Sequence, residues 1–296
     1  RWTVPILEQL PDAEVYVWNP NGPAIDADYA IVWQPPEALF EREKHLKAVF
    51  NLGAGIDGLL KVPNLPADLP VVRLEDAGMS AQMAEYVLHQ LLEASREMET
   101  YREQQRQGIW KIHRPIKRSE WPVGVMGLGH IGKRVARTLS NLDYRVSGWA
   151  RGDHSLEGVN TYAGPDQPGD FLKTTRVLVN TLPLTDETRN IIDYELRSQL
   201  QPGAVLINVG RGEHLVEEDL LRTLDEGKLL RASLDVFRKE PLPEEHPFWQ
   251  RKEITITPHI SARTLRDATI EQITRKIRDH AEGRAISGIV DTDRGY

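Results

Sequence analysis

The sequence predicts an α/β protein with two doubly wound parallel-sheet domains. Short runs rich in β-branched and aromatic residues alternate with helical runs over almost the whole chain, which is typical of parallel strands covered by helices. At 296 residues the chain is long enough for two hydrophobic cores, because single domains usually span roughly 100–200 residues. Hydrophobic residues make up 40% of the sequence and charged residues 27%, which indicates a globular protein.

The first part of the chain is expected to form one small open sheet followed by a long helix. The expected strands are residues 14–18, 28–33, 46–52 and 71–74, separated by turns that Pro and Gly mark. The helix is expected from Ser80, its cap, to about residue 107, with an apolar stripe that includes Val87 and Leu91. This helix is interpreted as a linker or an interface.

The second part of the chain is expected to form a larger sheet of six strands. These strands are expected at residues 121–126, 144–149, 176–181, 204–209, 232–236 and 254–257. Helices at 131–142 and 217–226 fit between them as in repeated βαβ units. A last amphipathic helix, residues 262–282, is placed to carry the chain back to the first domain.

A glycine motif directly follows the first strand of this larger sheet and opens a helix. Gly127 permits a tight turn, Gly129 lets the backbone approach a pyrophosphate, and Gly132 allows close packing of helix on strand. The helix begins near His130 and Ile131, where free N–H groups favour an anion. The same pattern without a ligand is a glycine-rich turn, but its place in an alternating domain favours dinucleotide binding.

The end of the next strand indicates which dinucleotide is bound. NAD sites usually carry an acidic residue there, which accepts hydrogen bonds from the ribose hydroxyls. Here the strand ends Trp149-Ala150-Arg151, and Arg151 is placed to pair with a 2′-phosphate, which favours NADP. Alternatively Arg151 is an ordinary surface arginine, and Asp153 serves as the acid of an NAD site if the strand ends a few residues later.

Arg211, Glu240 and His259 lie at or beside the ends of later strands, where ligands bind in such sheets. The guanidinium fork of Arg211 suits a carboxylate. A carboxylate such as Glu240 against the imidazole of His259 raises its pKa and favours the protonated acid. Each residue alone has an ordinary structural interpretation, as do the other histidines, and the shared location supports a catalytic site.

Composition and charge exclude several classes of protein. With 37 basic and 44 acidic residues the net charge is −7, so nucleic acid is not the expected partner. The absence of cysteine excludes disulfides, thiolate metal sites and a cysteine nucleophile, and it fits a reducing, cytoplasmic location. The apolar runs are strand-sized, so no membrane segment is expected. Because the sequence starts at Arg1, its native start and any targeting segment are expected upstream.

These motifs together resemble the D-2-hydroxyacid dehydrogenase family over nearly the whole chain. The most specific pieces are residues 127–132, Leu182-Pro183-Leu184-Thr185, 208–212, 234–237 with Glu240-Pro241, and Thr257-Pro258-His259. Within the family, the glyoxylate/hydroxypyruvate reductase A branch, which favours NADPH, is most similar. The pieces similar to that branch are residues 52–57, 73–79, 242–244 and 293–296.

The resemblance implies a Rossmann-type cofactor domain inserted in a flavodoxin-like substrate domain. The cofactor domain is residues 79–264, and the substrate domain is residues 1–78 and 265–296. The resemblance also implies reduction of a small 2-oxo acid, glyoxylate or hydroxypyruvate, by NADPH, with NAD as second choice, by a homodimer without a metal. The family's first strand, before the helix near residues 2–10, is missing here.

The resemblance further implies residue roles. Arg211 binds the substrate carboxylate and keto oxygen, His259 donates the proton, Glu240 orients and charges the histidine, and Asp235 holds the nicotinamide carboxamide. The other implied cofactor contacts are Gly127, Gly129, His130, Ile131, Gly132, Arg151, Leu182, Pro183, Thr188, Val209 and Gly210. The implied substrate contacts besides Arg211 are Gly53, Ala54 and Gly55 at the carboxylate, with Trp33 and Met79 shaping the pocket.

Two other functions stay open on the sequence. One is an NAD-dependent dehydrogenase of the same fold that acts on another 2-hydroxy acid. The other is a non-enzymatic, dinucleotide-sensing module like the corepressor branch that resembles this family, since fold does not settle function.

Overall fold

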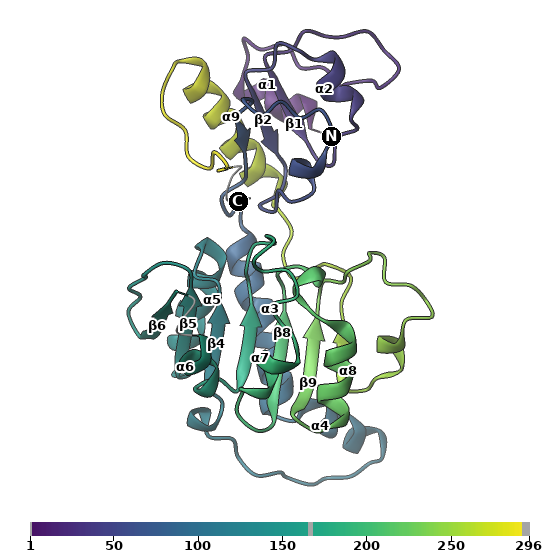
Figure 1. The fold of residues 1–296 in the computed structure, drawn as a ribbon, viewed down its shortest axis with the longest axis vertical. Coiled ribbons are helices and arrows are strands. Elements are labelled where there is room, and N and C mark those ends of the chain that lie inside the picture. The colour runs from purple at the N-terminus through teal and green to yellow at the C-terminus, as the bar shows by residue number, and fades with distance from the viewer. Residues whose placement is uncertain (1, 165–167, 292–296) are drawn as a thin grey trace. The chain divides into compact units, whose positions relative to one another are not determined.

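A computed structural model describes residues 2–164 and 168–291, which form two compact units (Figure 1). Unit 1 comprises Arg1–Met79 and Thr264–Tyr296, and unit 2 comprises Ser80–Arg263. Residues 293–296, part of the sequence resemblance, lie outside the described residues. Each unit has its own parallel sheet, so the expected α/β class is confirmed.

Unit 1 is built on a three-stranded parallel sheet. Its strands, in the order β1-β2-β3, are β1 (Tyr29–Val32), β2 (Ala48–Asn51) and β3 (Val71–Val72). Its helices are α1 (Thr3–Gln9), α2 (Ala38–Arg42), α9 (Arg266–Ala281) and the 3₁₀ turn η1 (Leu59–Lys61). Alternate β2 residues face opposite cores, because Val49 packs with Phe40 of α2 and Phe50 packs with Ile273 of α9.

The C-terminal helix α9 packs in unit 1, although all of unit 2 lies between it and the unit's N-terminal part in the sequence. The Gln272 side chain exchanges hydrogen bonds with the backbone of Glu75, at 2.8 and 2.9 Å. Arg278 donates to the carbonyl of Gln9, which closes α1, at 2.8 Å. The chain therefore returns to its first domain through α9.

The strand expected at residues 14–18 is wrong. These residues, all of which the structure describes, form no strand, and Tyr16 and Val17 are 60% and 83% exposed. The following backbone is held by the buried carboxylate of Glu43, which accepts hydrogen bonds from the N–H groups of Ile25 and Asp26 at 3.0 and 2.9 Å. Burial alone would raise the pKa of Glu43, but these hydrogen bonds outweigh it and lower the pKa.

The helix expected from Ser80 to about residue 107 is two helices, α3 (Met79–Ser95) and α4 (Met98–Arg106). The break lies at Glu97, whose φ of 52° is left-handed and ends the regular helical hydrogen bonding. Val87 and Leu91 of the apolar stripe on α3 are fully buried in the core of unit 2. These two side chains therefore pack within their own chain.

Unit 2 contains a seven-stranded parallel sheet in the order β10-β9-β8-β7-β4-β5-β6. The strands are β4 (Val123–Met126), β5 (Val146–Ala150), β6 (Val159–Ala163), β7 (Val177–Asn180), β8 (Ala204–Asn208), β9 (Leu229–Leu234) and β10 (Ile254–Ile256). The order reverses between β4 and β7, which makes that edge the expected ligand position. The sequence missed β6, an edge strand whose residues are only partly buried.

Helices cover both faces of this sheet. They are α5 (His130–Ser140), α6 (Pro168–Lys173), α7 (Tyr194–Ser198) and α8 (Glu217–Asp225), with 3₁₀ turns η2 (Arg118–Glu120), η3 (Gly212–His214) and η4 (Pro247–Gln250). One core joins α3 and α5 to the sheet, and the other joins α6, α7 and α8. No helix within residues 2–164 and 168–291 is long and apolar enough to cross a membrane.

Candidate active site

The glycine turn after β4 has a different requirement at each glycine. Gly127 has a φ of +94°, which favours glycine. A Cβ on Gly132 would lie 1.9 Å from the carbonyl oxygen of Gly127, so close packing of α5 on the turn needs a glycine there. A Cβ on Gly129 would meet no described heavy atom within 4 Å, so space is open beside the N-terminus of α5. His130 and Ile131 form the first turn there, whose N–H groups suit an anion.

The tip of β5 carries no carboxylate. The strand ends at Ala150, which is buried, and Arg151 follows with an exposed guanidinium. Its Nη1 lies 3.9 Å from Oε2 of Glu187. The strand end therefore places Arg151, and not Asp153, directly at the tip.

The loop after β7 lies against the glycine turn. The hydroxyl of Thr181 donates to the carbonyl of Gly127 at 2.9 Å. Leu182 is buried, and the carbonyl of Pro183 accepts a hydrogen bond from the hydroxyl of Thr188 at 2.7 Å. The structure therefore brings the predicted cofactor contacts Leu182, Pro183 and Thr188 into one loop beside the turn.

Val209 and Gly210 separate Arg211 from the end of β8, and Arg211 is half-buried. Its Nη1 donates to the carbonyl of Gly210 at 2.8 Å, and its own carbonyl accepts from Nδ2 of Asn208 at 3.0 Å. A Cβ on the next residue, Gly212, would lie 1.9 Å from the carbonyl carbon of Phe237. The backbone that carries Arg211 is therefore tightly fixed.

His259 and Glu240 form a hydrogen-bonded pair, with Nδ1 of the ring 2.8 Å from Oε2 of the carboxylate. The other oxygen of Glu240 accepts from the N–H of Phe237 at 3.0 Å. Nδ1 therefore carries a proton that it donates to Glu240. The side chain of His259 is about half exposed.

The pKa values of the pair move in opposite directions. The hydrogen bond to Glu240 raises the pKa of His259; burial opposes this, and the Glu240 charge adds to it. Burial alone would raise the pKa of Glu240, but the hydrogen bonds from His259 and Phe237 outweigh it and lower the pKa. The positive charge of Arg211 lowers both pKa values. The pair therefore favours a carboxylate beside an imidazolium.

Asp235, the residue after β9, fixes the loop that carries His259. Its side chain is fully buried, and it accepts hydrogen bonds from the hydroxyl of Thr257 and the N–H of Ile260, at 2.5 and 2.9 Å. Its second oxygen accepts from the N–H of Ser261 at 2.8 Å. Sequence reasoning missed this role, which follows from the pairing of β9 with β10.

In unit 1, the carboxyl ends of β1 and β2 lead into four of the predicted substrate contacts, Trp33, Gly53, Ala54 and Gly55. The side chain of Asn51 donates to the carbonyls of Gly53 and Gly55 at 3.0 and 2.9 Å, which shapes the turn around Ala54. A Cβ on Gly53 would lie 2.4 Å from the ring of Trp33, so this ring covers the turn. Met79 is the first residue of α3 and is buried.

Within the part of the chain that the structure describes, no group of three or more His, Asp or Glu side chains is placed to hold a metal ion.

The sheet order, the glycine turn and the polar groups beyond the strand ends define a dinucleotide-binding oxidoreductase of the Rossmann type. The family model "D-isomer specific 2-hydroxyacid dehydrogenase, NAD binding domain" matches residues 88–261, more than half of the chain. The chain belongs to the D-isomer specific 2-hydroxyacid dehydrogenase family. The resemblance inferred from the sequence motifs is thereby confirmed.

Curated relatives and solved structures agree with this assignment. The glyoxylate/hydroxypyruvate reductase A of Photorhabdus laumondii is 43% identical over 100% of this chain and 96% of that protein. The NADPH-dependent glyoxylate/hydroxypyruvate reductase of Sinorhizobium meliloti, solved with NADP and sulfate, has a TM-score of 0.87 and 37% identity, covering 91% and 86% of the two chains. A family member of Xanthobacter autotrophicus, solved with NADPH and MES, has a TM-score of 0.92 and 36% identity, covering 100% and 95%.

The glycine turn yields a matched pair of predictions. Gly132→Ala must displace the Gly127 backbone and should lower the free energy of unfolding by about 2–4 kcal/mol. Gly129→Ala meets open space, so its unfolding free energy should stay within about 1 kcal/mol of the native value. Its methyl group would instead occupy the space that a pyrophosphate approaches, and NADPH affinity should fall about tenfold or more. Urea unfolding measures the free energy of unfolding, and fluorescence titration measures NADPH affinity. An unchanged NADPH affinity in Gly129→Ala would contradict the prediction that a pyrophosphate binds at this turn.

Proposed function

We propose that this chain is an NADPH-dependent glyoxylate/hydroxypyruvate reductase, which reduces a small 2-oxo acid to the 2-hydroxy acid. The observation that carries the proposal is the His259–Glu240 pair, 2.8 Å apart, with Arg211 acting electrostatically on both. A proton donor beside a carboxylate-binding cation is what reduction of a 2-oxo acid requires. The names of the relatives support the same reaction.

In the proposed mechanism, bound NADPH supplies the hydride that adds to the keto carbon. Arg211 binds the substrate carboxylate and polarises the keto oxygen. Nε2 of His259 gives its proton to that oxygen as the alkoxide develops, and the ring becomes neutral. Glu240 keeps the Nδ1 proton in place and stabilises the imidazolium before transfer. The products are the 2-hydroxy acid and NADP⁺.

The cofactor is proposed to lie along the carboxyl edge of the unit 2 sheet. Gly129, where space is open, and the N–H groups of His130 and Ile131 would hold the pyrophosphate. Arg151 pairs with the 2′-phosphate. The remaining proposed contacts are Gly127, Gly132, Leu182, Pro183, Thr188, Val209, Gly210 and Asp235. Both carboxylate oxygens of Asp235 already accept hydrogen bonds from its own chain, so a nicotinamide carboxamide would share them.

Unit 1 is proposed as the substrate domain and unit 2 as the cofactor domain. The N–H groups of Gly53, Ala54 and Gly55 contact the substrate carboxylate in this proposal, supported by the turn that Asn51 holds. Trp33 and Met79 limit the length of the substrate. Trp33 is 59% exposed, so its ring is accessible to a ligand.

A cytoplasmic location is proposed as well. The support is the absence of cysteine in the whole sequence, which fits a reducing compartment.

Replacing the proton donor should abolish most turnover. His259→Ala is expected to lower kcat by roughly 10²–10⁴-fold, the usual contribution of a positioned acid, with NADPH affinity nearly unchanged.

Glu240→Gln removes the charge that raises the pKa of His259, so the pKa of His259 falls. Reduction needs the protonated ring, so kcat/KM should begin to fall at a lower pH than in the native enzyme. The pH profile measures this, with exposed Glu245→Gln as the unchanged control; an unshifted profile in Glu240→Gln would refute the pairing.

The substrate and cofactor are tested in one assay. Glyoxylate, hydroxypyruvate, pyruvate and phenylpyruvate are each paired with NADPH and with NADH. We expect the first two acids to give the highest kcat/KM, because each excess methylene group costs about 1–3 kcal/mol in a short pocket. NADPH should be preferred roughly tenfold or more.

A matched pair of variants at the β5 tip tests the cofactor choice. Ala150→Asp should shift the preference toward NADH by repelling the 2′-phosphate, whereas Ala150→Asn, with the same shape and no charge, should shift it much less. Equal use of both cofactors by the native chain would favour an NAD-dependent dehydrogenase. No turnover with any acid would favour a dinucleotide-sensing module.

A homodimer is also proposed, on a surface other than the α3 stripe. The segment after α4 exposes Ile109, Trp110 and Ile112 at 47%, 97% and 82%. Such adjacent apolar side chains are typical of a surface that a partner covers, and a second copy of this chain is the proposed partner. Sedimentation should give twice the 33.6 kDa chain mass, and replacing Trp110 and Ile112 together by Ser should raise the dissociation constant at least tenfold. Trp249→Ser is the control, and a native monomer would contradict the proposal.

A further inference from the structure

His214 is a fully buried histidine in η3 that the proposed mechanism does not use. It lies three residues after Arg211, and both ring nitrogens take part in hydrogen bonds. A buried imidazole has few ways to satisfy both nitrogens at once, so its partners define what it holds in place.

The Nδ1 side of the ring fixes the backbone of Arg211. Nδ1 accepts from the N–H of Arg211 at 3.1 Å and from Nδ2 of Asn180 at 2.8 Å. Asn180 also donates to Oδ1 of Asn208 at 2.9 Å, and Asn208 donates to the carbonyl of Arg211 at 3.0 Å. Both backbone groups of Arg211 are therefore held by one buried network. Because Nδ1 accepts, the ring proton must lie on Nε2.

The Nε2 side of the ring fixes the loop after β7. Nε2–H donates to the carbonyl of Pro183 at 3.1 Å. The same carbonyl accepts from the hydroxyl of Thr188 at 2.7 Å. One ring therefore joins the loop that carries the proposed substrate-binding arginine to the loop proposed to contact the cofactor.

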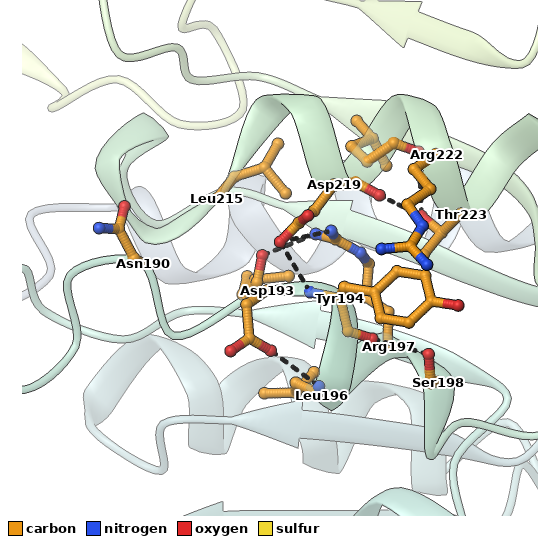
Figure 2. Close-up of polar contacts among 12 residues, drawn as sticks. Asn190, Asp193, Tyr194, Leu196, Arg197, Ser198, Leu215, Asp219, Arg222 and Thr223 are labelled. Atoms are coloured by element: carbon orange, nitrogen blue, oxygen red, sulfur yellow. Dashed lines mark hydrogen bonds and ion pairs between the residues drawn. The ribbon is translucent and has the colours of Figure 1, made fainter.

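The backbone of His214 is itself anchored to a buried cation. Its carbonyl accepts from the N–H of Ile192 at 2.8 Å, and the carbonyl of Ile192 accepts from Nη1 of Arg197 at 2.6 Å. Figure 2 shows Arg197 of α7 beside Asp219 of α8, and these two groups form an ion pair at 4.0 Å. Burial lowers the pKa of Arg197 to about 10, so the guanidinium stays charged at neutral pH. The ring of His214 thus has little freedom to shift.

We propose that His214 is a positioning residue that holds Arg211 through Nδ1 and the 182–183 loop through Nε2–H, and so fixes the substrate and cofactor contacts relative to each other. This inference rests on the proposed function. The proposal assigns the Nδ1 side of the ring to substrate binding and the Nε2 side to cofactor binding. Substitutions that keep one side and remove the other can therefore test the two roles separately.

The test uses a matched pair of variants. In His214→Asn the amide lies near the former Nδ1 and can still accept from Arg211, but the bond to Pro183 is lost. In His214→Gln the amide reaches the former Nε2 position and can still donate to Pro183, but the acceptor for Arg211 is lost. Binding is measured without turnover, by fluorescence titration of NADPH and by calorimetry of oxalate, an unreactive dicarboxylate, in the NADPH complex.

We expect His214→Asn to weaken NADPH about tenfold and oxalate less than threefold, because the loop after β7 loses its link to the ring while Arg211 keeps its acceptor. His214→Gln should show the reverse, because the Arg211 N–H loses its acceptor. The same replacements at exposed His89 are the controls and should change neither constant. Equal shifts of both constants in both variants, or no shift in either, would overturn the inference. Failure of the proposed function has a different signature, namely no turnover of any 2-oxo acid by the native chain.

A second measurement needs no variant. Nitrogen-15 NMR of the native chain should show the His214 ring neutral at pH 7, with the proton on Nε2 and none on Nδ1. A proton on Nδ1 would exclude the bond from the Arg211 N–H and overturn the inference, even if a substituted chain does not fold.

Discussion

The structure of unit 2 depends on one constraint: all seven strands are parallel, so their carboxyl ends meet at one edge. Each residue of the proposed chemistry in this unit follows such an end. The glycine turn follows β4, Arg151 follows β5, Arg211 follows β8 and His259 follows β10. The reversal of strand order between β4 and β7 leaves that edge open to a ligand, because the connections leave it in opposite directions.

Local charge decides what this edge can bind, since the chain as a whole carries a charge of −7 and offers no general attraction to an anion. The helix N-terminus beyond Gly129, the guanidiniums of Arg151 and Arg211, and the imidazolium of His259 are the positive elements. The carboxylates of Glu240 and Asp235 accept hydrogen bonds from the histidine and from the loop around it. In the proposed function the negative groups position the histidine and its loop, and the positive groups bind the ligands.

The strand positions, the glycine turn and the three groups after strand ends could be predicted from the sequence, because periodicity and motif spacing are local properties of the chain. The absence of a carboxylate at the β5 tip was also predictable. Three expectations failed where local pattern competes with tertiary contacts. The segment 14–18 finds no neighbouring strand, the helix ends at the left-handed Glu97, and β6 is an edge strand whose partly buried residues carry a weak apolar signal.

The sequence by itself determined which residues follow strands, and therefore which side chains reach the ligand edge. Only the tertiary structure decided how those side chains are held. Asp235 binds N–H groups 25 and 26 residues away in the chain, and the ring of His214 meets Pro183 across 31 residues. Such contacts depend on which strands are neighbours in the sheet. The sheet order places β8 between β7 and β9, and no local pattern in the chain specifies that order.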